Sequence, residues 1–396
     1  MSSEDFKIAV IGAGPVGLFF ALELLKRGII VDVFEEHSRI GVPKHCAGVV
    51  SIGGLNKLCF SDGKYVLNKV RGALIHSPSG KYSLKVARRD FQAYILDREA
   101  FDQNLYYEAT SRGVRVFLNS FVKDVTKTNR KTWRIAVGKG STREYDLIVD
   151  AEGASLKIAR SLGVRVPKDA RLPAIQFELK GIQDIDEDFV EVFLGNRWAH
   201  GFFAWLVPLC STEARVGLAS YTRPRIMLDY LLHKHPLMRN RVKRAKIKEV
   251  NAGLVIVSGP AWRFFGDGYI MVGDAAGHVK PTTGGGIVFG MLGAKVAAEV
   301  IQEALKSGDF SRAVLKKYSE LWERNYGGEF KAMKMARRIF TRLDDSKLES
   351  LIKALSREDF LEVIEKFGDM DFQRSVISRI LLSPRFLFSL LKAFLA

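Results

Sequence analysis

A glycine-rich turn near the N-terminus constrains the fold of this chain more than any other feature. The apolar run 6–11 leads into Gly12-Ala-Gly14-Pro-Val-Gly17, and a helix-like stretch follows at 16–27. Gly12 permits a tight turn, Gly14 lets the backbone approach a pyrophosphate, and Gly17 lets the helix pack closely on the strand. The amides that open the helix favour an anion. This order predicts a dinucleotide-binding unit in a parallel, doubly wound α/β sheet.

An acidic residue completes the pattern. Glu35 lies 23 residues after Gly12, at the end of the next predicted strand, 29–34. A carboxylate there can accept hydrogen bonds from the hydroxyls of an adenosine ribose.

A second glycine segment lies late in the chain. The predicted strand 269–272 ends in Gly273-Asp274, and Pro281-Thr-Thr-Gly284-Gly285-Gly286-Ile287 opens a predicted helix at 285–305. The carboxylate suits ribityl hydroxyls, and the helix amides would stabilise negative charge on a reduced flavin ring. Because an NAD-only domain needs no such segment, the two patterns together predict FAD.

The rest of the chain predicts the domain order. We expect the first part of the FAD-binding domain at 1–165 and its second part at 256–310. Alternating apolar residues within 173–220 predict an antiparallel substrate lobe, which we place at 166–255. Residues 311–396 are predicted to be helical, 65–86 to form a hairpin, and 38–55 to be a long loop.

Charge and cysteine content limit the partners. The 396 residues include 61 Lys and Arg against 44 Asp and Glu, a formal net charge of +17. Without a nucleic-acid-binding motif, this charge suits an anionic membrane surface, a phospholipid headgroup or a small acidic electron carrier rather than nucleic acid. Three scattered cysteines exclude a disulfide framework and fit a reducing compartment. We see neither a signal peptide nor a membrane span and expect a cytoplasmic protein. His233 and His235 lack partners at ligand spacing, so no metal is predicted.

Three further segments carry a family resemblance. They are Pro43-Lys-His-Cys46-Ala-Gly-Val, Leu96-Asp-Arg98-Glu-Ala-Phe101-Asp and Phe203-Ala-Trp205-Leu-Val-Pro208. With the glycine motifs, they resemble the geranylgeranyl reductase family, in particular its digeranylgeranylglycerophospholipid reductases, within the para-hydroxybenzoate hydroxylase group of flavoproteins. The resemblance covers about the first 330 residues and implies a Rossmann-like FAD domain of that type.

The resemblance also implies site residues. Beside Gly12, Gly14, Gly17, Gly273 and Gly285, the positions that match FAD contacts are Val16, Glu35, Cys46, Ala47, Arg98, Val122, Asp274, Gly286 and Ile287. Phe203, Trp205 and Pro208 match the substrate side. The chain departs from the family pattern at Ala47 and Val49, where the family has glycine, at Phe203 and Val207, and at Lys280, where Asp or Asn is usual.

Several of these residues have two interpretations. The Cys46 thiol is either a proton donor or a small residue packed against the flavin, and Arg98 either binds FAD or pairs with Asp102. Trp205 and Phe203 either line a tunnel for a prenyl chain or belong to the core. Lys280 either favours the anionic reduced flavin or points into solvent. We expect His45 and His278 to be packing or hydrogen-bonding residues.

The resemblance implies reduction of carbon–carbon double bonds in geranylgeranyl chains, on membrane-lipid precursors. A flavin-dependent aromatic monooxygenase and a membrane-associated electron-transfer flavoprotein remain alternatives. The electron donor, ferredoxin or NAD(P)H, is undetermined. The segment 374–396 has four cations, no acid and many large apolar residues. It fits either a helix that lies on the inner face of an anionic membrane or a helix docked on the protein.

Overall fold

The computed structural model describes residues 6–129, 131–138 and 140–385. The chain forms two compact units, each built from three segments. The first unit comprises Met1–Pro43, Arg98–Arg171 and Ile256–Phe330, and the second comprises Lys44–Asp97, Leu172–Val255 and Lys331–Ala396. Each unit is described by itself.

The first unit is built on a six-stranded sheet in the order β18-β19-β12-β1-β2-β8. Its strands are β1 (Ile8–Ile11), β2 (Asp32–Phe34), β8 (Arg115–Phe117), β12 (Leu147–Asp150), β18 (Phe265–Gly266) and β19 (Tyr269–Met271). All neighbours pair in parallel except β18 with β19. Every residue of β1 and β12 is buried, as in sheets covered on both faces. The predicted doubly wound fold is confirmed.

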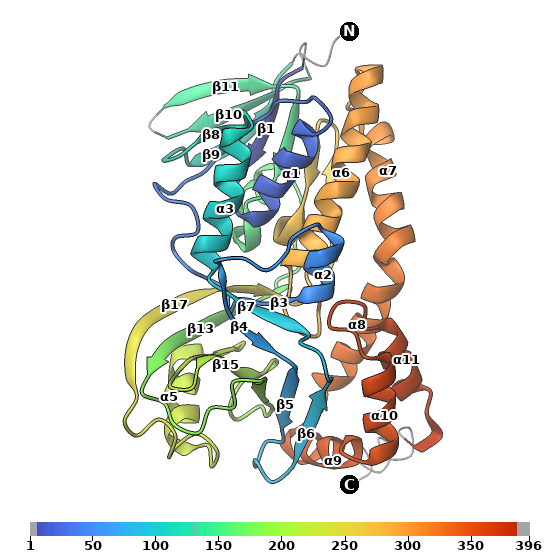
Figure 1. Cartoon of the computed structure of the whole chain (residues 1–396). Coiled ribbons are helices and arrows are strands. Elements are labelled where there is room, and N and C mark those ends of the chain that lie inside the picture. Colours follow the sequence, from blue (N-terminus) through green and yellow to red (C-terminus); the bar gives the residue numbers. More distant parts are fainter. Residues whose placement is uncertain (1–5, 130, 139, 386–396) are drawn as a thin grey trace. The chain divides into compact units, whose positions relative to one another are not determined.

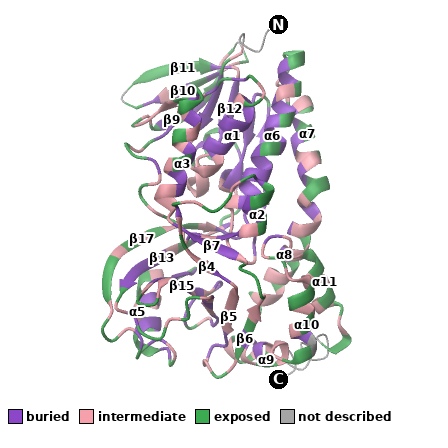
Figure 2. Cartoon of the chain, viewed as in Figure 1, coloured by how far each residue is buried: buried purple, intermediate pink, exposed green. Residues whose placement is uncertain are grey.

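The same unit contains four long helices, α1 (Pro15–Leu25), α3 (Arg98–Ser111), α6 (Ile287–Ser307) and α7 (Arg312–Trp322). Helix α1 packs against α3 and α6, and α6 packs against α7 (Figure 1). Figure 2 shows the consequence, because α1 and much of α6 are buried whereas α7 exposes one side. The glycine turn before α1 is therefore held by a rigid core.

A small antiparallel sheet completes the first unit, with β9 (Val122–Lys127), β10 (Trp133–Val137) and β11 (Ser141–Tyr145). Two of these strands lack the apolar alternation of a half-buried strand. In β11, four of the five residues are exposed, so its sequence carries almost no apolar alternation. Strand β9 buries every third residue, which also differs from the expected strand period of two.

The second unit contains the predicted antiparallel lobe, a seven-stranded sheet in the order β17-β13-β16-β15-β14-β5-β6. Its strands are β5 (Gly72–His76), β6 (Ser83–Ala87), β13 (Arg171–Lys180), β14 (Phe189–Phe193), β15 (Ala204–Cys210), β16 (Glu213–Ala219) and β17 (Lys246–Ile256). The predicted hairpin is formed by β5 and β6. Because β5 also pairs in parallel with β14, residues 44–97 join the lobe expected at 166–255.

The range predicted as a loop, 38–55, extends too far toward the C-terminus. It contains β3 (Val49–Ser51) and the start of α2 (Ile52–Lys57), and β3 pairs with β7 (Ala93–Leu96), which also pairs with β4 (Val66–Val70). The Ser51 hydroxyl accepts the Gly54 amide at 2.9 Å and caps α2. The glycines of α2 hid this helix, because glycine lowers helix propensity.

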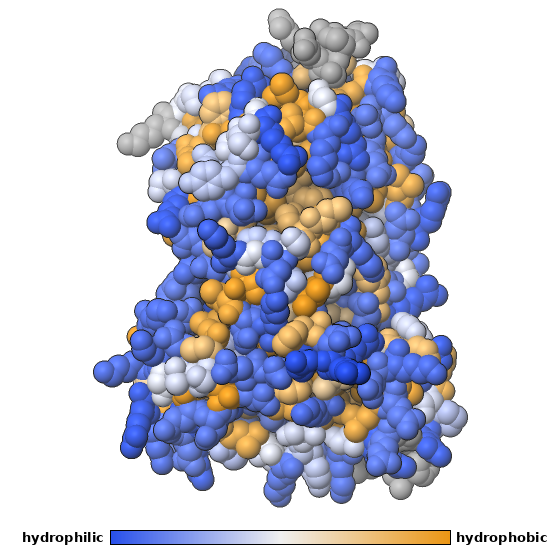
Figure 3. All heavy atoms as spheres, viewed as in Figure 1, coloured by the Kyte–Doolittle hydropathy of each residue, from blue (hydrophilic) through white to orange (hydrophobic). Residues whose placement is uncertain are grey.

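The remaining helices are α4 (Lys157–Ser161), α5 (Pro224–Lys234), α8 (Gly328–Phe340), α9 (Asp345–Leu355), α10 (Glu358–Phe367) and α11 (Arg374–Leu381). The predicted helical C-terminal region is thus confirmed as far as residue 385, and 386–396 lie outside the described residues. Charged and polar side chains cover most of the face seen in Figure 3. In the described part of the chain, no helix has the length and apolarity needed to cross a bilayer.

Candidate functional site

The three glycines of the first motif meet three different requirements. Gly12 has φ +104°, and a Cβ there would lie 2.4 Å from the Ala151 carbonyl oxygen, while a Cβ on Gly17 would lie 2.1 Å from the Gly12 oxygen. Beside Gly14, a Cβ would meet no described atom within 4 Å. Two glycines therefore serve the fold, and Gly14 leaves room for a ligand. Helix α1 starts here without a side-chain cap, so its amides can bind an anion.

Glu35 is tied to this turn. Its Oε2 accepts the Ala13 amide at 3.0 Å, and its Oε1 accepts the His37 amide at 3.0 Å. The His37 Nδ1 also lies 2.6 Å from Oε1. Because a carboxylate oxygen can accept about two hydrogen bonds, Oε2 of Glu35 can hold the turn and still accept a ribose hydroxyl.

The second glycine motif meets the first. A Cβ on Gly273 would lie 3.2 Å from Val16 Cγ1, and a Cβ on Gly286 would lie 2.6 Å from Asp274 Oδ1. Burial raises the pKa of Asp274, the nearby Arg98 guanidinium opposes this rise, and the net pKa is about 6. Val16 of α1, Asp274 after β19 and Gly286 at the start of α6 thus form one site.

Arg98 pairs with Asp102, and its contact with FAD stays a prediction. Its Nη2 lies 3.0 Å from each carboxylate oxygen of Asp102, in a pair that is mostly buried. Its charge also reaches Asp274. Val122 is buried at the start of β9. The predicted pair with Asp102 is therefore part of the site's charge balance and does not lie on the surface.

Two acids at the carboxyl end of β12 were not singled out from the sequence. Asp150 is fully buried, its Oδ1 accepts the Glu152 amide at 3.0 Å, and its Oδ2 has no partner among the described residues. Burial raises its pKa well above 3.8. Glu152 accepts the amides of Lys157 and Ala159 and so caps α4. The detectable signal was their position, since ligands bind at the carboxyl ends of parallel strands.

The structure shows the surroundings of Lys280 and His278, two residues of the turn before α6. Lys280 is only 3% exposed and lies over Gly285, where a Cβ would be 2.8 Å from Lys280 Cε. It does not point into solvent. His278 stacks on Trp322 at 3.6 Å, and burial lowers its pKa to about 3. The imidazole is therefore a neutral packing residue.

Cys46 and Ala47 belong to the second unit. The half-buried Cys46 Sγ accepts the Gly48 amide at 3.3 Å, and His45 Nδ1 donates to the Ala252 carbonyl at 2.6 Å. Ala47 and Val49 pack on an apolar cluster that includes Val207 and Trp205. The second unit thus brings together the cysteine segment and the predicted substrate strand, β15.

Trp205 of β15 and Phe203, which directly precedes the strand, lie at alternate positions and so on one face of the seven-stranded sheet. The Trp205 indole lies over Gly217, where a Cβ would be 2.8 Å from the ring, and its Nε1 donates to Gln176 Oε1 at 2.9 Å. The Phe203 ring stacks on Phe202 at 4.1 Å. Trp205 and Phe203 are half-buried, whereas Pro208 is buried. Trp205 and Phe203 offer partly exposed apolar surface on a face that also carries the polar Gln176.

The first unit has the groups that an FAD needs. An uncapped helix start beside Gly14 suits the pyrophosphate, Glu35 suits the ribose, and Asp274 suits the ribityl hydroxyls. The assignment of individual contacts stays a prediction. Over the described ranges, no three His, Cys, Asp or Glu side chains gather as metal ligands would.

Comparison with known proteins gives consistent relatives over the whole chain. The family model described as lycopene cyclase protein matches residues 7–383. The digeranylgeranylglycerophospholipid reductase 2 of Methanopyrus kandleri is 32% identical over 95% of this chain and 96% of its own length. The digeranylgeranylglycerophospholipid reductase of Methanothrix thermoacetophila is 31% identical over 97% and 98%.

Solved structures agree. A geranylgeranyl bacteriochlorophyll reductase-like protein from Thermoplasma acidophilum aligns with a TM-score of 0.86 and 25% identity, over 98% of this chain and 99% of its own. A flavin-dependent brominase aligns with a TM-score of 0.73 at 18% identity, over 94% and 97%, which shows a shared fold. The chain therefore belongs to the geranylgeranyl reductase group of flavin-dependent oxidoreductases, within the family that the lycopene cyclase model describes.

Proposed function

We propose that this protein uses FAD to hydrogenate isolated carbon–carbon double bonds in the geranylgeranyl chains of a membrane-lipid precursor. The observation that carries the proposal is the identity of 31–32%, over nearly the full length, to proteins named digeranylgeranylglycerophospholipid reductase. Those names supply the substrate class, and the two glycine motifs supply the flavin site.

The first unit would bind and orient FAD. Gly12, Gly14 and the start of α1 hold the pyrophosphate, Glu35 the adenosine ribose, and Asp274 the ribityl chain. Arg98, Val122, Gly285, Gly286 and Ile287, with Cys46 and Ala47 of the second unit, complete the predicted contacts. When bound and reduced, flavin supplies the hydride for each double bond.

The second unit would receive the prenyl chain. The half-buried face of β15, with Phe203 and Trp205, offers apolar and aromatic contact, and Pro208 is the third residue predicted there. An alkene offers no group for a hydrogen bond, so shape and exclusion of water must position it. The Cys46 thiol is our candidate for the group that gives the alkene its proton.

The substrate is insoluble in water, so the protein must meet it at a lipid surface. We propose that the basic surface and the segment 374–396 bind the anionic inner face of a membrane. The electron donor would be a reduced ferredoxin or NAD(P)H.

The decisive experiment is anaerobic incubation of chemically reduced protein with a geranylgeranyl lipid, followed by mass spectrometry. Hydrogenation adds two hydrogen atoms for each double bond, whereas cyclisation leaves the mass unchanged. A monooxygenase needs dioxygen, so without air it would leave the lipid unchanged. Unchanged lipid under these conditions, with flavin that stays reduced, contradicts the proposal. An apoprotein control excludes reduction by the chemical reductant itself.

A further inference from the structure

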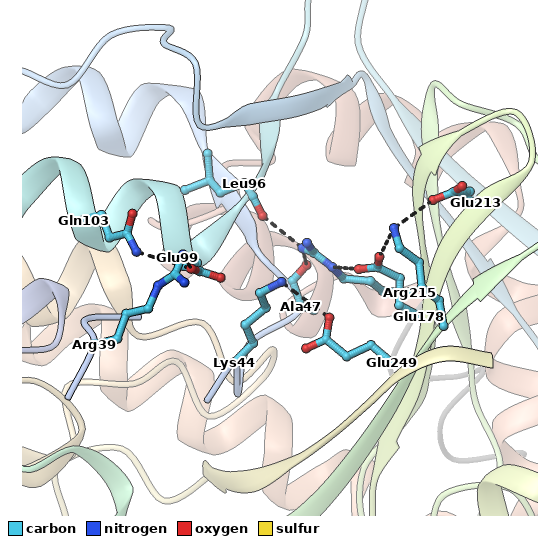
Figure 4. Close-up of polar contacts among 11 residues, drawn as sticks. Arg39, Lys44, Ala47, Leu96, Glu99, Gln103, Glu178, Glu213, Arg215 and Glu249 are labelled. Atoms are coloured by element: carbon cyan, nitrogen blue, oxygen red, sulfur yellow. Dashed lines mark hydrogen bonds and ion pairs between the residues drawn. The ribbon is translucent and has the colours of Figure 1, made fainter. Parts of the chain in front are cut away.

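A buried arginine in the second unit is hydrogen-bonded to the loop that carries Cys46. Arg215 on β16 is 4% exposed, and its Nη1 donates to the carbonyl oxygens of Ala47 at 3.0 Å and Leu96 at 2.9 Å. Figure 4 shows the guanidinium between these two carbonyls. Gly48 has φ +84°, and a Cβ there would lie 2.7 Å from Nη1. The loop backbone therefore passes directly against the arginine.

Arg215 is held in place by an acid on the neighbouring strand, β13. Its Nε lies 3.5 Å from Glu178 on β13, and Lys248 on β17 lies 2.9 Å from Glu178 and 3.4 Å from Glu213. Burial raises the pKa of Glu178, but the hydrogen bond from Lys248 and the charge of Arg215 outweigh it, so the pKa is lowered. Lys180 also lies 3.6 Å from Glu213, so Glu178 is the carboxylate that balances the charge of the buried arginine.

The rest of the loop is fastened to neighbouring strands. Lys44 lies 3.4 Å from Glu249 on β17, and His45 donates to the Ala252 carbonyl on the same strand. The Leu96 amide donates to the Gly48 carbonyl at 2.8 Å. Within the loop, the Gly48 amide points at Cys46 Sγ. Arg215 adds a side-chain link between the loop and β7, because it binds Ala47 in the loop and Leu96 in β7.

We propose that Arg215 is the positioning residue of the 44–48 loop and sets the direction in which Cys46 and Ala47 are presented for the reaction. The inference rests on the proposed function, in which this loop meets flavin and alkene. One guanidinium nitrogen binds two carbonyls while another faces a carboxylate. A lysine cannot reproduce this arrangement with its single nitrogen.

The chain offers a matched control, because Arg241 makes the same kinds of contact elsewhere in this unit. Its Nη1 and Nη2 lie 3.0 and 2.8 Å from the oxygens of Glu191, Nε donates to the Gln183 carbonyl at 3.2 Å, and Nη2 donates to the Asp184 carbonyl at 2.7 Å. Arg241 is also buried. None of its described hydrogen bonds reaches the 44–48 loop, so Arg241→Lys loosens the same unit without touching Cys46.

Cys46 reports on the loop without any substrate. Iodoacetamide alkylation of the full-length protein is followed by peptide mass spectrometry, with the exposed Cys59 as internal reference. We expect Arg215→Lys to raise the ratio of Cys46 to Cys59 alkylation about ten-fold. The variant loses hydrogen bonds that hold the loop, and a loosened loop opens locally far more often than the whole unit unfolds. We expect Arg241→Lys to leave the ratio unchanged. An unchanged ratio in folded Arg215→Lys, or an equal change in Arg241→Lys, overturns the proposal.

Glu178→Gln covers the case in which Arg215→Lys does not fold. It weakens the anchor of Arg215 but leaves both carbonyl bonds, so the alkylation ratio should rise by a smaller factor, and no rise counts against the proposal. With reduced enzyme and lipid, Arg215→Lys should lower kcat with little change in KM. If Cys46→Ala is fully active while the alkylation result holds, the thiol's proton role fails but the positioning role stands.

Discussion

At the scale of single residues, the site depends on charged residues and glycines whose substitution would disturb either the fold or the flavin site. The positive charge of Arg98 partly balances the carboxylates of Asp102 and Asp274. Asp150 adds a carboxylate whose pKa is raised by burial. A group held in an unfavourable environment by the fold is a frequent mark of a functional site. Four residue-scale predictions follow from this environment and from the two glycine turns.

Asp274 predicts a pH dependence in the flavin-free protein. Its pKa of about 6 lies above the ordinary 3.8, so folding disfavours the ionised carboxylate. The contribution of Asp274 to the free energy of unfolding therefore falls as pH rises from the lower value to the higher. Urea titrations should find apo Asp274→Asn more stable than the parent at neutral pH, and the difference should shrink in acid. A difference independent of pH contradicts the assignment.

With flavin present, the same carboxylate should be needed. Asp274→Ala removes the acceptor proposed for the ribityl hydroxyls and leaves them unpaired, which costs about 1–3 kcal/mol of binding free energy. Equilibrium dialysis or flavin fluorescence measures the loss. If this variant retains flavin as tightly as the parent, Asp274 does not belong to the site.

Gly14 separates folding from binding. A methyl group there meets no described protein atom within 4 Å, so Gly14→Ala should fold with nearly the parent's Tm. It should nevertheless weaken FAD binding, because the methyl group occupies the space through which a pyrophosphate would approach. Gly17→Ala is the contrasting variant, since its Cβ would strike the Gly12 carbonyl and should lower Tm in the apoprotein. Parent-like FAD affinity in Gly14→Ala would place the pyrophosphate elsewhere.

Lys280 should raise the reduction potential of bound flavin. Its side chain lies buried over the turn that opens α6, where a cation favours an anionic reduced ring. Spectroelectrochemistry should find a more negative midpoint potential in Lys280→Gln. Lys295→Gln, on an exposed position of the same helix, serves as control and should match the parent. An unchanged potential in Lys280→Gln excludes the electrostatic role.

At the scale of elements, the question is whether the C-terminal segment 374–396 docks on the protein or binds a membrane. Helix α11 packs on α10, and the Arg379 guanidinium lies 3.6 Å from the centre of the Phe367 ring. No residue of α11 is fully buried. The described part of the segment therefore has a contact with the protein's own body and also an open side.

Flotation with anionic liposomes tests this segment. Each Lys or Arg near the bilayer contributes about 1 kcal/mol at modest salt, so deletion of 374–396 should release the protein from vesicles while flavin stays bound. Deletion of 382–396 leaves α11 and its contact with Phe367 in place and controls for damage to the fold. Binding that persists without 374–396, or loss of folding in both deletions, supports docking on the body.

At the scale of the whole molecule, three separate chain segments build each unit. The segments of the first unit contribute Glu35, Asp150 and Asp274, so a ligand there links distant parts of the sequence. Ligand binding to the native state raises Tm with ligand concentration. FAD should therefore raise Tm much more than FMN does, because FMN lacks the adenosine half that Glu35 and the first glycine turn would hold. Equal shifts would leave those residues without a ligand role.

The sequence by itself determined the local features. Strand β1, helix α1 and the glycine turn between them follow from apolar periodicity and from backbone angles that only glycine tolerates. Strand β19 with Asp274, and helix α6, were predicted in the same way. These features depend on neighbours in the chain, so a short stretch of sequence contains the whole physical reason.

Only the tertiary structure decided what lies together across the chain. Arg215 could not be singled out, because an arginine in a strand reads as a solvent-facing charge until Ala47, Leu96 and Glu178 surround it. The parallel pairing of β5 with β14 was hidden for a related reason. The two strands are distant in sequence, and local propensity contains no record of such a partner.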